Sequence, residues 1–337
     1  MTSFSDLARD ARTARMVLSM LAEPDDAVTG RLLTRLGGVK TVGLLDGDGK
    51  VPGMGRVDGQ VWRERLTAAA RPDELAGRLR NVEAAGIGVV IPGDPHWPVS
   101  LSDLGDREPF VLWTRGDSLF LSRPLADLLT ITGSRAATSY GEHVAGGFAT
   151  DLARDGRVVV AGGAYGIEGA AHRAALASSG DTIAVLAGGV DRPYPAGHRD
   201  LLDQIADVGL LVSETPPGAT PTRHAFLARG RLLAALSNTT IVVEAGTRSG
   251  SLYTARQAHD LGRNVGAVPG PVTSVTSAGP HQLIGEHRAR IVTDAGQITN
   301  LLHMQEAVQE GPRQSPLGSA FSRDHTRRDV GHDGPSL

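Results

Sequence analysis

The feature that most constrains the fold is a regular alternation of short apolar runs and segments of helical length after residue 128. Six runs have the length of strands, and they cover residues 128–132, 158–160, 182–186, 210–212, 240–243 and 265–268. A segment long enough for a helix separates each run from the next, which is typical of a parallel sheet covered by helices on both faces. We therefore predict a doubly wound, mostly parallel α/β sheet.

Residues at the ends of the helical segments support this pattern. Ser139 and Glu142 have the spacing of a capping box at the start of the first helix. Four glycines stand between a helical segment and the next strand, where a left-handed residue is favoured. These are Gly156, Gly180, Gly209 and Gly262.

The rest of the chain divides at changes in texture. Residues 1–75 carry apolar side chains at three- and four-residue spacing, which predicts a small helical domain, and residues 76–300 form the α/β domain. The segment 36–43, with two glycines, allows either a helix-hairpin-helix turn that binds phosphate through backbone amides or an ordinary helix stop. Residues 301–337 are expected to form a disordered tail, because most of this segment is rich in Gly, Pro, Ser and Arg without periodicity.

Composition excludes several functional classes. The chain has no cysteine and no His-Glu-x-x-His pair, so we expect no disulfide, thiolate nucleophile or metal site. The segment 47–50 is not a phosphate loop, because Leu44 and Val51 stand where Gly and Ser or Thr are required. With neither a signal peptide nor an apolar stretch approaching about 18 residues, the chain is expected to be cytoplasmic and not to bind a membrane.

Glycine-rich loops follow the first three strands of the pattern. In a doubly wound sheet the ligand lies at the carboxyl ends of the strands. Gly133, Ser134 and Arg135 follow the first strand, Gly162, Gly163 and Gly166 follow the second, and Gly188 and Gly189 follow the third. Such glycines either make tight turns or let backbone amides approach an anion, and Arg135 favours a phosphate. The G-x-G-x-x-G pattern is missing from the first loop, so no dinucleotide or other cofactor is expected.

A basic stretch follows later in the chain. Residues 221–263 contain six arginines against Glu244 and Asp260, a net charge of +4 in a chain whose net charge is −3. Arg229 and Arg231 follow Phe226 closely, and an aromatic face beside two guanidinium groups suits a single nucleic-acid strand. For the Phe226 ring alone an ordinary core role is favoured over base stacking, and Phe226 is included in the predicted DNA-binding set.

Two further groups of polar residues could carry chemistry. Ser249, Gly250 and Ser251 provide either an anion-accepting helix N-terminus or a plain cap. No serine lies in a nucleophile elbow, and the position of His172 is typical of an ordinary helix residue, so we predict no catalytic residue.

An ordered set of motifs resembles the DNA-processing protein A family, also called DprA or Smf, over roughly residues 85–295. The motifs are Gly133-Ser134-Arg135, residues 161–172, Asp191 to Pro195, Ser213-Glu214, Arg229-Gly230-Arg231, Val243 to Ala245, Ser249 to Leu252 and Val268-Pro269-Gly270. The resemblance implies a Rossmann-like domain after a sterile-alpha-motif-like one. It also implies a non-enzymatic mediator that binds single-stranded DNA, forms homodimers and helps to load the RecA recombinase during natural transformation or DNA processing. The family's pocket then falls on Gly133, Ser134, Arg135, Gly162, Gly163, Gly166, Arg229 and Arg231.

The chain departs from the family pattern at a few positions. Glu168 stands where the family usually has Asp, Gly230 where it has Asn, Leu227 where it has Pro, and His281 near a usual Asn. The tail also lacks the pattern of the winged helix that often ends the family. These departures concern RecA loading and transformation more than binding of single-stranded DNA.

The alternative is an enzyme similar to the Lonely Guy phosphoribohydrolases, which act on nucleoside monophosphates. Their glycine-rich segment is similar, and Glu244 would act near a ribose phosphate. In this chain Glu244 precedes Gly246-Thr247, whereas the family's acidic residue follows its Gly-Thr turn.

Overall fold

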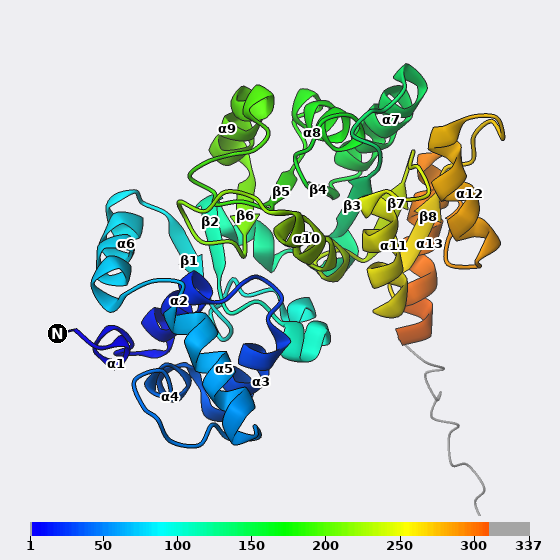
Figure 1. The fold of residues 1–337 in the computed structure, drawn as a ribbon. Helices are drawn as coiled ribbons and strands as arrows, with labels where there is room; N and C mark the ends of the chain where they lie inside the picture. Colours follow the sequence, from blue (N-terminus) through cyan, green and yellow to red (C-terminus); the bar gives the residue numbers. More distant parts are fainter. Residues whose placement is uncertain (1, 310–337) are drawn as a thin grey trace, which may run out of the picture.

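The computed structural model describes residues 2–309, and it combines a helical N-terminal region with one large sheet (Figure 1). Among the described residues, no helix has both the length and the apolar character needed to cross a bilayer. The N-terminal helices are α1 (Phe4–Leu7), α2 (Ala11–Leu21), α3 (Ala27–Leu36), α4 (Gly38–Gly43), α5 (Arg56–Thr67) and α6 (Pro72–Ala84).

The sheet of the described residues has nine strands in the order β1-β2-β6-β5-β4-β3-β7-β8-β9. The pairs β1–β2 and β2–β6 are antiparallel and all other neighbouring pairs are parallel, which confirms the predicted mostly parallel sheet. The strands are β1 (Gly88–Val90), β2 (Leu112–Gly116), β3 (Leu128–Thr132), β4 (Val158–Ala161), β5 (Thr182–Leu186), β6 (Leu210–Ser213), β7 (Thr239–Val242), β8 (Asn264–Ala267) and β9 (Arg290–Ile291).

Helices cover both faces of the sheet, as the continuous apolar strands require. In β3, Leu129 and Ile131 point into a core formed with α7, α8 and α13, whereas Leu128 points into a core formed with α10. The helices of this part are α7 (Ser139–Arg154), α8 (Ile167–Ala177), α9 (Arg199–Val208), α10 (Arg223–Ala235), α11 (Gly250–Asp260), α12 (Ala278–Gly285) and α13 (Ala295–Gln309). Short 3-10 helices are η1 (Val99–Arg107), η2 (Ser118–Ser122), η3 (Leu125–Asp127), η4 (Ala196–His198) and η5 (Val275–Ser277).

The N-terminal helices share a core with one end of the sheet. Trp113 of β2 is completely buried among N-terminal apolar side chains, and its Nε1 donates a hydrogen bond of 3.0 Å to Ser19 of α2. Our boundary at residue 75 falls inside α6. The boundary at residue 300 falls inside α13, whose Leu301 and Leu302 are buried, so the predicted tail begins too early. The remainder of that tail, residues 310–337, lies outside the described residues.

The predicted helix ends are partly correct. Gly156 and Gly262 adopt the left-handed conformation, each with φ of 71°, but Gly209 has φ of −144° and Ser179 takes the positive φ beside Gly180. The capping box predicted for Ser139 and Glu142 is not formed. Thr138, not Ser139, caps α7, and its hydroxyl accepts from the Gly141 N–H.

Candidate nucleic-acid interface

The carboxyl ends of β3, β4 and β7 open into a groove of about 1040 Å³. The loop after β3, the first turns of α10, and the loop from β7 into α11 form its walls. The lining residues are Thr132, Gly133, Ser134, Arg135, Ala136, Ala164, Glu168, Pro221, Thr222, Arg223, Phe226, Leu227, Arg229, Gly246, Thr247, Arg248, Ser249, Gly250, Ser251, Tyr253, Thr254, Arg256 and Val275.

The groove carries an excess of positive charge. Five arginines line it, whereas Glu168 is the one acidic residue among the lining side chains. Arg229 pairs with Glu168, and Arg256 lies 3.3 Å from Glu286. The remaining three lining arginines, Arg135, Arg223 and Arg248, are exposed and have no carboxylate partner within residues 2–309. An anionic ligand would therefore meet cations that the protein itself leaves uncompensated.

An aromatic ring contacts two of the five arginines that line the groove. The guanidinium carbon of Arg135 lies 4.5 Å from the centroid of the Phe226 ring, and that of Arg229 lies 5.6 Å from it. Tyr194 approaches the same ring edge-on at 5.9 Å. Phe226 is half-buried at the groove wall and belongs to none of the buried core clusters, so its interpretation as an ordinary core residue is wrong.

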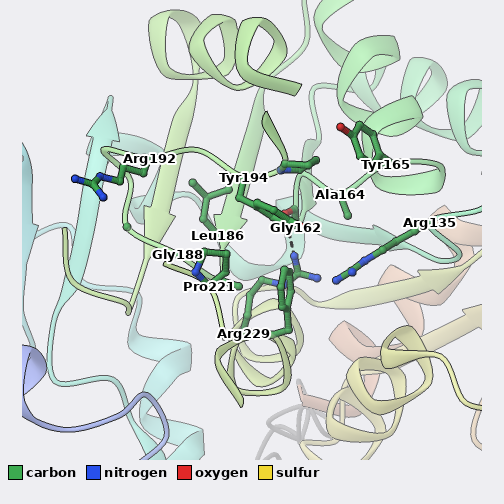
Figure 2. Close-up of a pocket in the computed structure, with 14 residues that line it drawn as sticks. Arg135, Gly162, Ala164, Tyr165, Leu186, Gly188, Arg192, Tyr194, Pro221 and Arg229 are labelled. Atoms are coloured by element: carbon green, nitrogen blue, oxygen red, sulfur yellow. Dashed lines mark hydrogen bonds between the residues drawn. The ribbon is translucent and has the colours of Figure 1, made fainter. Parts of the chain in front are cut away.

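A smaller pocket adjoins the groove, and Figure 2 shows Arg135 and Arg229 extending toward each other at its edge. The two hollows share Arg135, Ala164, Pro221, Phe226 and Arg229. The smaller one continues over the loop after β5, where Leu186, Gly188, Gly189 and Tyr194 line it. Charged and aromatic surfaces therefore extend across the ends of four neighbouring strands, β7, β3, β4 and β5.

Arg229 is held in place by the protein and does not swing freely. Its Nη1 donates 2.9 Å to the Gly162 carbonyl, and its Nη2 lies 3.3 Å from the carboxylate of Glu168. Burial by itself raises the pKa of Glu168, but the charge of Arg229 and hydrogen bonds from Ala164 and Thr132 hold that pKa below its ordinary value. Glu168 therefore stays ionised and orients Arg229 toward the groove.

The predicted glycines fall into two groups. Gly133 and Gly162 line the hollows, and a Cβ at Gly162 would overlap the Arg229 guanidinium. Gly163 and Gly166 line neither hollow. Gly166 has φ of 72°, and a Cβ there would overlap the carbonyls of Ser134 and Arg135, so this glycine supports the loop that presents Arg135.

Ser249, Gly250 and Ser251 line the groove at the start of α11. Ser249 is the N-cap of this helix, and its hydroxyl lies 2.7 Å from that of Ser251. The cap of α11 is therefore part of the groove wall, and an anion-accepting role for this helix N-terminus stays a prediction.

The structure contradicts the placement of Arg231 in the pocket. Arg231 is 0% exposed and lies outside the groove, where its guanidinium donates 2.8 and 2.7 Å to the two carboxylate oxygens of Glu214 and its Nε lies 2.9 Å from Asp25. Residues two apart on a helix point about 200° apart, so Arg229 and Arg231 of α10 face opposite sides. Arg231 is a structural residue.

Glu244, the residue that the enzymatic alternative would use, is engaged by hydrogen bonds within the protein. Its carboxylate accepts from the Thr138 N–H at 2.8 Å, the Thr138 hydroxyl at 2.7 Å and the Thr276 hydroxyl at 3.0 Å. It is buried, and it is not among the groove-lining residues. Glu244 therefore ties two loops together.

His172 is a buried residue of α8. Its Nδ1 lies 2.8 Å from the hydroxyl of Thr182, which itself donates to the Val159 carbonyl, so Nδ1 carries the proton. Burial lowers the pKa of His172 to about 4, and the imidazole is neutral at pH 7. No cluster of metal-ligating side chains exists within the part of the chain that the structure describes.

Several groove residues were missed in the site prediction. Arg223, Arg248, Arg256 and Tyr253 line the groove, and Tyr194, which was missed as well, lines the smaller pocket. The net charge of residues 221–263 was the available signal for the three arginines, but it does not show which of the arginines share a face.

Comparison with known proteins places the chain in one family. The model of the DNA recombination-mediator protein A family matches residues 88–303. A putative DNA processing protein DprA of Mycobacterium tuberculosis is 45% identical over 310 residues, which is 88% of this chain and 76% of that protein. DNA processing protein DprA of Bacillus subtilis is 37% identical over 66% of this chain and 77% of its own length.

Two solved structures of DNA processing protein A are similar to this chain. DNA processing protein A of Streptococcus pneumoniae has a TM-score of 0.69 at 27% identity, over 89% of this chain and 98% of its own. DNA processing protein A of Helicobacter pylori, solved for its binding of single-stranded DNA, has a TM-score of 0.58 at 29% identity, over 65% of this chain and 96% of its own. The chain thus has a basic, aromatic groove at the strand ends of a Rossmann-like sheet, and its sequence is similar to those of these proteins. It belongs to the DNA recombination-mediator protein A family, also called DprA or Smf.

Proposed function

We propose that this chain binds single-stranded DNA in the groove between the loop after β3 and the helices α10 and α11. The observation that carries the proposal is the set of three exposed arginines in the groove that have no carboxylate partner within residues 2–309, one of which, Arg135, stacks on the ring of Phe226. Phosphates pair with guanidinium groups, and an unstacked base has a π-face that an aromatic ring accepts. The relative from Helicobacter pylori, which binds single-stranded DNA, supports the same ligand here.

The geometry favours a single strand over a duplex. The guanidinium groups of Arg135 and Arg229 lie close to one aromatic ring, so phosphate contacts and base contacts occur together. A duplex keeps its bases stacked inside and would reach only the cations at the rim. Binding is expected to be largely independent of sequence, because the groove has few side chains able to read base edges.

We further propose that the chain acts in the cytoplasm as a non-enzymatic homodimer that protects single-stranded DNA and helps to load RecA during natural transformation or DNA processing. Family membership supports this role. The test is RecA filament formation on single-stranded DNA with the parent chain and with Arg135→Ala. Stimulation by the parent and its loss in the variant support loading, and the absence of stimulation by the parent contradicts it.

A filter-binding comparison tests the binding proposal itself. Oligo-dT of about 20 nucleotides, the matching duplex and nucleoside monophosphates are titrated between about 50 and 200 mM salt. We expect the single strand to bind most tightly, with an affinity that falls with salt by a logarithmic slope of about 0.7 per phosphate contact. Equal affinity for the duplex, or a salt-independent affinity, contradicts the assignment of the groove.

A further inference from the structure

A cluster of four charged side chains, of which Arg107 is 35% exposed and the other three are largely buried, joins the N-terminal helices to the sheet. Asp25 lies in the turn between α2 and α3, Arg107 ends η1, Glu214 follows β6, and Arg231 lies on α10. Arg107 donates two hydrogen bonds of 2.7 Å to the carboxylate of Asp25. The Nε of Arg231 lies 2.9 Å from the same carboxylate. Arg231 also holds Glu214 with two hydrogen bonds.

The charges in this cluster balance only when all four side chains are present. The side chains of Arg231, Glu214 and Asp25 are 0%, 9% and 14% exposed, so solvent compensates little of their charge. Asp25 is the carboxylate with which both arginines form ion pairs, and it is the member of the cluster that belongs to the N-terminal helical region. Removing its charge leaves two arginines against one carboxylate.

The cluster continues to one wall of the groove. Arg107 donates a hydrogen bond of 3.1 Å to the hydroxyl of Tyr253 and one of 2.9 Å to the side-chain oxygen of Gln257. Both acceptors lie on α11, and Tyr253 lines the groove. Asp25 is therefore two hydrogen bonds away from a groove residue.

The other arginine fixes the second wall. Arg231 belongs to α10, which presents Phe226 and Arg229 on its opposite side. The start of α10 has another tie to the same N-terminal turn, since His224 lies 2.8 Å from the Pro24 carbonyl. Helices α10 and α11 pack closely at Gly230, where a Cβ would lie 2.9 Å from the Thr254 hydroxyl.

We propose that Asp25 is a positioning residue for binding of single-stranded DNA, which it supports by holding α10 through Arg231 and α11 through Arg107. The N-terminal helical region is then a working part of the groove, although none of its residues line it. This inference rests on the proposed function of the groove. It differs from a purely structural role because it requires the groove helices of the folded protein to change when Asp25 is neutralised.

The experiment uses the full chain with Asp25→Asn and a matched control, Asp106→Asn. Asp106 pairs with Arg31 at 2.9 Å and so also joins the N-terminal helices to η1, but within residues 2–309 its side chain makes no hydrogen bond or ion pair with α10 or α11. Affinity for an oligo-dT of about 20 nucleotides is measured by fluorescence anisotropy at a temperature where both variants are folded. Asp25→Asn is expected to raise Kd at least fivefold and Asp106→Asn less than twofold.

Hydrogen exchange on the same samples supplies a readout of position. Faster amide exchange in α11 is expected for Asp25→Asn and not for Asp106→Asn. If Asp25→Asn does not fold, Arg107→Gln takes its place, because it leaves Arg231 paired with both carboxylates and removes the tie to α11. For that variant we expect at least a threefold rise in Kd.

Binding by the parent chain distinguishes a failure of the proposed groove function from a failure of the proposed role of Asp25. A parent that fails to bind oligo-dT contradicts the proposed function of the groove. A parent that binds, with a folded Asp25→Asn variant whose Kd and α11 exchange match those of Asp106→Asn, overturns the role of Asp25 alone. When Arg107→Gln is the variant used, a Kd within twofold of the control overturns it in the same way.

Discussion

The guanidinium group of Arg135, from the loop after β3, stacks over the ring of Phe226, from α10, at 4.5 Å. The ring orients the guanidinium without neutralising it, because the attraction comes from the π face and not from a carboxylate. Arg135 has no side-chain hydrogen bond or ion pair within the described residues, so its donors are available to a ligand. This contact brings together two parts of the chain that the sequence keeps far apart.

Arg135 is therefore the most informative position to change. Arg135→Ala is expected to weaken binding of single-stranded DNA by about 1.5–3 kcal/mol, the usual contribution of a charged hydrogen bond. Arg135→Lys should weaken it less, because lysine keeps the charge and loses the planar fork. Kd and Tm are measured on the same samples, and Tm should stay close to the parent value because the side chain is exposed.

The control for this prediction is Arg154→Ala. Arg154 is an exposed arginine at the far end of α7, outside the groove, with only a surface contact to Asp151 at 3.7 Å. It should leave Kd unchanged. A folded Arg135→Ala protein that binds as well as Arg154→Ala removes Arg135 from the site.

Arg248 tests whether the groove continues toward α11. Its side chain is exposed and lines the groove, which predicts one phosphate contact. Arg248→Ala should reduce the slope of log affinity against log salt by about 0.7, and Arg248→Lys should retain the slope. Titrations at several salt concentrations measure it, and identical slopes for the alanine variant and the parent exclude the contact.

His172 predicts a pH dependence of stability. Its pKa is lowered by burial to about 4 in the folded chain, from an ordinary value of 6.5. The unfolded chain therefore binds a proton at a higher pH than the folded chain, and the free energy of unfolding falls as the pH drops from 6.5 toward 4. Between pH 7 and pH 5 the expected loss is about 2 kcal/mol.

Denaturant unfolding of His172→Leu measures this contribution. The variant should lose most of the pH dependence between pH 7 and pH 5, whereas His259→Gln, which changes an exposed histidine, should keep it. The range from pH 7 to pH 5 lies above the pKa of Glu168, which is lowered in the folded chain. The contribution of Glu168 to the free energy of unfolding is therefore lost only at lower pH, as the pH falls through that lowered pKa. A His172→Leu protein with the pH profile of the parent rules out His172 as the source.

The enzymatic alternative predicts release of free base from nucleoside monophosphates. We expect none, because the Glu244 carboxylate is engaged by Thr138 and Thr276. Glu244→Gln should instead lower stability by about 1–3 kcal/mol, since an amide cannot satisfy all three donors. Free base is measured by chromatography of the reaction mixture. Base release by the parent that exceeds release by Glu244→Gln would support the enzymatic alternative.

Local chemistry explains why the strands were predictable. Runs such as 128–132 and 182–186 are apolar along their whole length because both faces of a parallel sheet are covered, and the structure places β3 and β5 at these residues. β4 and β6 each extend one residue beyond the prediction, and β7 and β8 begin and end one residue earlier than predicted. The glycine-ended loops follow from the same topology, since the chain must turn sharply at each strand end.

The sequence by itself determined the succession of strands and helices along the α/β part of the chain and the edge of the sheet where a ligand is expected. It also identified Arg135 and Phe226 as candidate site residues. It could not separate Arg229 from Arg231, because that requires knowing that both lie on α10 and which side of this helix faces the groove. It also could not reveal Asp25 beside Arg107 and Arg231, because only tertiary packing decides which distant charges share a buried site. Local signals act over a few residues, whereas the charge balance of a buried cluster depends on side chains that come together only when the whole chain has folded.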